Sequence, residues 1–141
     1  MDLNKSFNYD RVAIDTGVWV EIGDEARVKV AKYGNKAWTA GLLALYNKNK
    51  MLVDRAMSED GAWLTSKKLR ELFAETVFLD WESIEDEGVK QEYSIETCAA
   101  VCEKYPEFAQ EVMKISQQEA LFLVQEDEEV GKSSGADSDG S

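Results

Sequence analysis

The chain has 141 residues, of which 44% are hydrophobic, and its formal net charge is −12. This length suits one globular domain with a sizeable core, and the negative charge argues against a nucleic-acid backbone or an anionic membrane as partner. No apolar run approaches the roughly 20 residues of a membrane span and no signal peptide opens the chain, so we expect a cytosolic protein.

A β-hairpin is the first predicted element. Residues 18–22 alternate in the manner of a strand, and residues 26–33 alternate again with Val28 and Val30 pointing inward. The turn signal Gly23-Asp24-Glu25 separates the two runs, as expected between paired strands.

A helix is predicted next, because the apolar spacing changes from two to 3.6 residues after Asn35, a residue type that can cap a helix. One stripe continues through the polar run Asn47-Lys48-Asn49-Lys50, which favours one long helix over two. Its members are Trp38, Leu42, Leu45, Leu52 and Ala56.

The following helix is predicted to be capped by Thr65 or Ser66 and to end at Trp81. Phe78 lies almost opposite the apolar stripe of this helix, so either the helix is covered on two sides or Phe78 meets a partner. An acidic loop from Ile84 to Glu92, turned at Gly88, follows.

Two more helices complete the predicted domain. Ser94 caps the first, and Pro106 ends it near Tyr105 and begins the second, which continues through Phe122 although Glu119 interrupts its apolar stripe. We expect one globular domain over residues 1–125 and a flexible, disordered acidic tail over residues 126–141. The expected fold is mainly α, of the α+β class, with an N-terminal β-hairpin packed on a bundle of about four helices.

The sequence offers few groups for catalysis. It has no histidine, and Cys98 and Cys102, four residues apart on one helix face, are expected to be buried small hydrophobes. The acidic residues Asp80, Glu82, Glu85, Asp86 and Glu87 favour a solvated loop over a cation site or a glycosidase-type pair. We therefore expect a protein that is not an enzyme and that holds no cofactor and no metal.

Aromatic residues are the candidates for a protein-binding site. Most of the four tryptophans are expected to fill the core, but Trp81 closes a helix and neighbours Phe78. The predicted contributors to client binding or self-association are Phe78, Trp81, Ile84 and Phe122.

Two segments resemble the tail assembly chaperones of long-tailed (siphovirus-type) bacteriophages. The first runs from Val28 through Asn35 to Trp38 and is similar to that family's strand and helix start. The second combines an aromatic helix end, an acidic turn, a capped helix and a proline: Asp80-Trp81, Ile84, Asp86, Gly88, Tyr93-Ser94, Glu96 and Tyr105-Pro106-Glu107. The chain departs from the family pattern at Lys32, where arginine is common, and at the two cysteines.

The resemblance implies a non-catalytic chaperone that acts in the cytoplasm of the bacterial host and is absent from the mature virion. Its partners would be the tape-measure protein, the tail-tube protein and further copies of itself, with no nucleic acid and no membrane. It also implies a longer frameshifted product. The alternative hypothesis is an acidic phage-encoded inhibitor, or nucleic-acid mimic, of a host enzyme, which the net charge of −12 would suit.

Overall fold

The computed structural model describes residues 1–125, and the predicted acidic tail lies outside the described residues. Helices make up 56% of the described residues and accompany a small antiparallel sheet, so the prediction of a mainly α, α+β protein is confirmed. The α-helices are α1 (Leu3–Phe7), α2 (Arg11–Thr16), α3 (Lys36–Lys48), α4 (Lys50–Ala56), α5 (Lys67–Thr76), α6 (Ile95–Lys104) and α7 (Pro106–Ser116). The 3-10 helices are η1 (Ala62–Thr65) and η2 (Glu119–Phe122).

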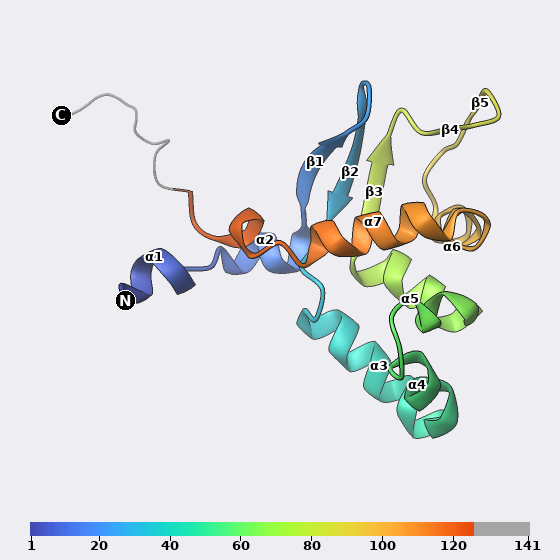
Figure 1. Cartoon of the computed structure of the whole chain (residues 1–141), viewed down its shortest axis with the longest axis horizontal. Coiled ribbons are helices and arrows are strands. Elements are labelled where there is room, and N and C mark those ends of the chain that lie inside the picture. Colours follow the sequence, from blue (N-terminus) through green and yellow to red (C-terminus); the bar gives the residue numbers. More distant parts are fainter. Residues whose placement is uncertain (126–141) are drawn as a thin grey trace.

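Three strands form the main sheet, in the order β1 (Val18–Ile22), β2 (Ala26–Val30) and β3 (Phe78–Glu82). The predicted hairpin is confirmed, since β1 and β2 pair antiparallel from Val18 opposite Val30 to Ile22 opposite Ala26. In Figure 1 this sheet stands above a lobe formed by α3, α4 and α5, and α7 crosses between them.

Strand β3 corrects the prediction that a helix continues to Trp81. Helix α5 ends at Thr76, and β3 pairs antiparallel with β2, with Val30 opposite Phe78 and Val28 opposite Trp81. The register shifts between Lys29 and Val30, so Phe78 and Trp81 can both be buried although they are three residues apart. In the sequence, apolar residues three positions apart are typical of a helix.

The predicted long helix is divided at Asn49, which ends α3 and begins α4. The Asn49 side chain accepts a hydrogen bond from Leu52 N at 3.1 Å and so caps α4. This local cap sets the helix boundary, although the apolar stripe continues through it. The expectation of one helix here is wrong.

The predicted caps of α5 and α6 are confirmed, with Ser66 accepting from Leu69 N and Ser94 accepting from Thr97 N. Pro106 begins α7, as predicted. The last helix is shorter than expected because α7 ends at Ser116 and Phe122 lies in η2. The N-terminal helices α1 and α2 were not predicted.

An aromatic cluster forms the centre of the core around Phe78, which has 0% exposure. Four rings surround the Phe78 ring, with centroids 5.6 to 6.4 Å away: Phe73, Trp81, Tyr93 and Phe108. They come from α5, β3, the segment before α6, and α7. Phe78 therefore joins the sheet to α5, to α7 and to the segment before α6.

Replacing Phe78 with alanine should lower the free energy of unfolding by about 3–5 kcal/mol, because the surrounding rings cannot close the cavity. Val89, which is 62% exposed, provides the control, and Val89→Ala should change stability by less than about 0.5 kcal/mol. Chemical denaturation measures both. A loss below about 1 kcal/mol for Phe78→Ala would contradict this core.

Candidate functional site

The four residues predicted to bind protein do not form one surface. Phe78 and Phe122 are fully buried and Trp81 is 5% exposed, whereas Ile84 is half-buried. The premise that Phe78 faces away from its own helix is wrong, because Phe78 lies in β3 and faces the core. The buried three cannot touch a partner without opening the fold.

Trp81 and Tyr93 instead fix the segment that carries the second resemblance. The Trp81 ring donates from Nε1 to Gln91 O at 2.8 Å. The Tyr93 hydroxyl lies 2.7 Å from Ala74 O and 2.6 Å from Phe78 O and shares its one proton between them. Burial raises the pKa of Tyr93, so the hydroxyl keeps this proton. These contacts connect the end of α5, strand β3 and the start of α6.

The predicted acidic loop is a small hairpin of β4 (Glu85–Asp86) and β5 (Val89–Lys90), turned at Gly88. Asp86 accepts hydrogen bonds from Lys104, at 2.8 Å, and from the Tyr105 hydroxyl. These two donors hold the pKa of Asp86 below its usual range. The hairpin is thereby attached to the end of α6.

Other carboxylates of this segment also have partners. Glu82 pairs with Arg27 at 2.9 Å, and Asp80 accepts from Trp81 N at 2.8 Å. Their contacts match structural roles rather than a catalytic carboxylate pair.

Cys98 and Cys102 are free and fully buried, as predicted. Hydrogen bonding with Cys102, together with burial, raises the pKa of the Cys98 thiol, which leaves it a poor nucleophile. Within residues 1–125, no group of three or more histidine, cysteine or acidic side chains is placed to hold a metal ion. None of the helices in that same part of the chain is long and apolar enough to cross a membrane.

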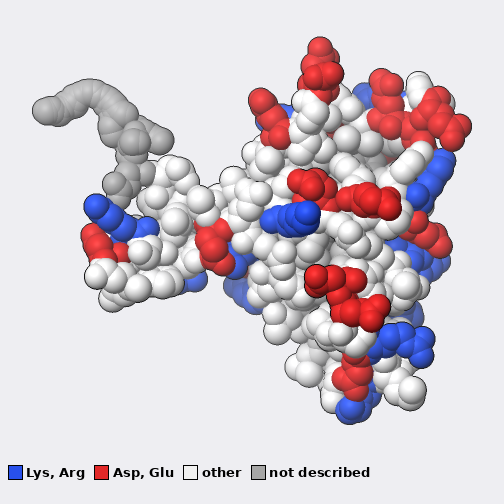
Figure 2. Space-filling view, in the orientation of Figure 1, with Lys and Arg blue, Asp and Glu red and all other residues white. Residues whose placement is uncertain are grey.

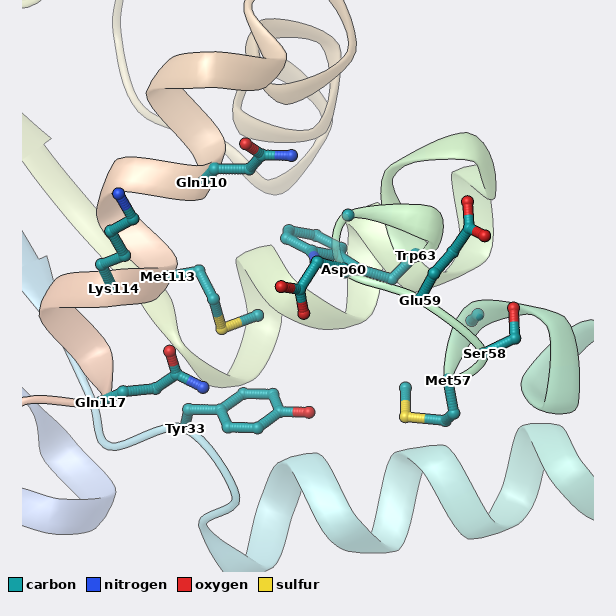
Figure 3. Close-up of a pocket in the computed structure, with 12 residues that line it drawn as sticks. Tyr33, Met57, Ser58, Glu59, Asp60, Trp63, Gln110, Met113, Lys114 and Gln117 are labelled. Atoms are coloured by element: carbon teal, nitrogen blue, oxygen red, sulfur yellow. The ribbon is translucent and has the colours of Figure 1, made fainter.

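A groove of about 450 Å³ lies between the end of α4, the loop before η1, and α7. We call it the methionine groove, because Met57 at the end of α4 and Met113 on α7 form two of its sides (Figure 3). Tyr33 points across it toward Met57, and Asp60 and Trp63 line it from the η1 side. The remaining lining residues are Ala56, Ser58, Glu59, Gly61, Gln110, Lys114 and Gln117.

The groove walls are fixed, whereas its methionines can adapt. Trp63 is buried against Phe73, with ring centroids 4.6 Å apart, and Tyr33 packs on Trp38 at 5.3 Å. Met57 is 46% exposed, and its unbranched thioether can fit differently shaped apolar side chains. A firm aromatic base with one exposed and one half-buried methionine suits contact with apolar side chains, although half of the lining residues are polar or charged.

Sequence reasoning did not find this groove. Met57 and Met113 are distant in the chain, and neither belongs to a recognisable motif. The one sequence signal nearby is Asp60-Gly61, which indicates only a loop. Gly61 adopts φ +80, and a Cβ there would lie 2.5 Å from Gln110 Nε2, inside the groove.

Replacing Lys104 with methionine should raise the pKa of Asp86 toward the ordinary value of about 4. In the parent protein the folded-state pKa lies below the unfolded one, so this contact stabilises the fold above pH about 4 and is lost as the pH falls through the folded pKa. Carboxyl NMR titration measures the shift. An unchanged Asp86 pKa would show that Lys104 does not act on it; Lys90→Met is the control.

The comparisons with known proteins identify one family. A family model described as "YdaY prophage protein" matches residues 34–133, more than two thirds of the chain. The match covers α3 to α7 and all of the methionine groove except Tyr33. No curated protein matches the chain, and no solved structure matches it. On the family match, this chain belongs to the YdaY prophage protein family.

Proposed function

We propose that this prophage protein is a tail assembly chaperone and that its methionine groove holds apolar side chains of the tape-measure protein. The proposal draws on the prophage family, on the resemblance around Trp81 and Tyr93, and above all on the groove itself. The groove is the observation that carries it.

A tape-measure protein is a long helical polypeptide whose apolar stripes would associate if left bare. An amphipathic helix can place its apolar side chains in a hydrophobic groove, with anchors three or four residues apart. The volume of about 450 Å³ accommodates a few such side chains and not a whole helix. Met57 and Met113 would adjust to the different side chains met along the client.

The residues that carry the resemblance would act by positioning. Trp81 and Tyr93 fix β3 between α5 and α6, and α7 follows α6 after the single break at Tyr105. Because Met113 lies on α7, this frame sets one wall of the groove. The buried aromatic residues would then shape a client site that they do not touch.

The charge distribution gives the chaperone a means to keep a coated client soluble. Residues 77–125 hold eleven acidic and three basic side chains, a net of −8. Figure 2 shows acidic side chains around the tips of the two hairpins, at the upper end of the molecule. Copies bound along one client would repel other assemblies through this surface. We place this activity in the host cytoplasm, before the virion is complete, and include the tail-tube protein as a second partner.

The same acidic surface is what favours the alternative, an inhibitor that mimics nucleic acid. Mimicry needs free carboxylates spaced like phosphates, but Asp86 and Glu82 are paired with Lys104 and Arg27. The position of the gene separates the two functions: a chaperone gene should lie between the tail-tube and tape-measure genes, and an inhibitor gene in an early operon.

Co-purification with the tape-measure protein of the same prophage tests the proposal. Met57→Lys should weaken binding at least tenfold, or about 1.4 kcal/mol, because a charge would replace an apolar side chain that the client is proposed to contact. Met51→Lys is the matched control, since Met51 is exposed on the same helix but does not line the groove; it should change the affinity less than twofold. Equal binding by both variants would contradict the groove as client site, and no binding by the parent protein would contradict the chaperone function.

A further inference from the structure

The N-terminal helix α1 extends from the body of the protein with its apolar side chains uncovered. Leu3 is 68% and Phe7 52% exposed, and α1 has no buried residue. Phe7 borders the body beside Asn35 and Lys36, and hydrogen bonds to the body begin at Asn8, where Asn8 O accepts from Val124 N at 2.8 Å and Asp10 N donates to Phe122 O at 2.7 Å. We call residues 1–7 the arm.

The arm is shaped as a helix that needs a partner. Asp2 caps it by accepting from Asn4 N at 3.0 Å, and Leu3 and Phe7 are four residues apart, on one side. A helix this short is not stable in water by itself, so its apolar side requires a surface to pack on. Its own chain covers only part of that side, since Leu3 and about half of Phe7 stay exposed.

Helix α3 supplies a matching surface. No charged residue occurs between Lys36 and Lys48, although most side chains of α3 are exposed and only Trp38 is buried. Leu43 is 59% exposed, and Ala40, Ala44 and Asn47 are exposed at helical spacing beside it. We call these four residues the outer face of α3; the outer edge of that helix is largely white in Figure 2. A solvated helix face ordinarily carries charges.

The arm and the outer face of α3 cannot meet within one molecule. The arm points away from α3 in Figure 1, and the hydrogen bonds at Asn8 and Asp10 hold it there. Because these two apolar surfaces point in different directions on one chain, they suit a contact between two copies of it.

The two parts of the chain that would meet carry opposite net charges. Residues 36–76, which include α3, hold seven basic and five acidic side chains and so carry +2, whereas the rest of the chain carries −14. The arm itself holds one acid and one base, Asp2 and Lys5, and Glu119 near its base is paired with Lys32 at 3.5 Å. The attraction is therefore between the basic lobe of one copy and the acidic remainder of another, rather than between the arm's own charges and α3.

We infer that the arm docks on the outer face of α3 of a second copy of this chain. The Phe7 ring and Leu3 cover Leu43, and the small side chains Ala40 and Ala44 let the arm approach closely. Because the two surfaces differ, the contact is head-to-tail and repeats into an open chain. The arm is smaller than the roughly 800 Å² per partner of a standard interface, so the association is weak and reversible. It would hold whether or not the methionine groove binds a client.

Sedimentation velocity of the full chain over a concentration series tests this contact. Leu3→Ser with Phe7→Ser, and separately Leu43→Lys, should each lower the association constant at least tenfold. Val89→Ser, also an exposed apolar position but distant from both surfaces, should leave it within twofold. Neither surface contributes to the core, so all variants should keep the parent's melting temperature.

Mixing the two defective variants separates head-to-tail association from symmetric pairing. The arm variant keeps its α3 face and the Leu43→Lys variant keeps its arm, so a mixture should form one-to-one dimers that grow no further. Higher salt should weaken the parent's association. The inference is overturned if the mixture stays monomeric, if only one of the two variants loses association, or if the parent is monomeric at every concentration.

Discussion

The pairing of β3 with β2 is the constraint on which the rest of this structure depends. It turns the chain out of α5 at Thr76 and brings Phe78 to the centre of four aromatic rings. Two polar side chains hold the junction: Asn35 Nδ2 donates to Thr76 O at 2.8 Å while its Oδ1 caps α3, and the Tyr93 hydroxyl reaches Ala74 O and Phe78 O. The sheet, α3, α5 and α6 thus meet at one place, where a buried polar group without a hydrogen-bond partner would destabilise the fold.

This pairing places the large aromatic residues around β3 in the core, away from the surface that is available to partners. Trp38, Trp63, Trp81 and Phe78 are buried, and the apolar side chains left exposed include Met57 in the groove, Leu43 on α3, and Leu3 and Phe7 on α1. Methionine adapts to shape at little cost, which suits a chaperone that meets many different segments of one client.

Much of the fold was predictable where local signals agree. The hairpin, the caps at Asn35, Ser66 and Ser94, and Pro106 at the start of α7 follow from residue type and period. One error arose where tertiary pairing decides, because the bulge beside Val30 gives Phe78 and Trp81 a helical spacing in a strand. The other was a conflict between two local signals, since Asn49 caps a helix inside a continuous apolar stripe. The residues of the candidate groove were not predictable, since Met57 and Met113 meet only after folding.

NMR of protein labelled at the methionine methyl groups tests the proposed client site most directly. The chain has four methionines, and Met57 and Met113 line the groove, whereas Met1 and Met51 lie outside it. Addition of a helical fragment of the tape-measure protein should shift the methyl signals of Met57 and Met113 and leave that of Met51 in place. Shifts confined to Met1 and Met51, or no shift at saturating fragment, would contradict the account.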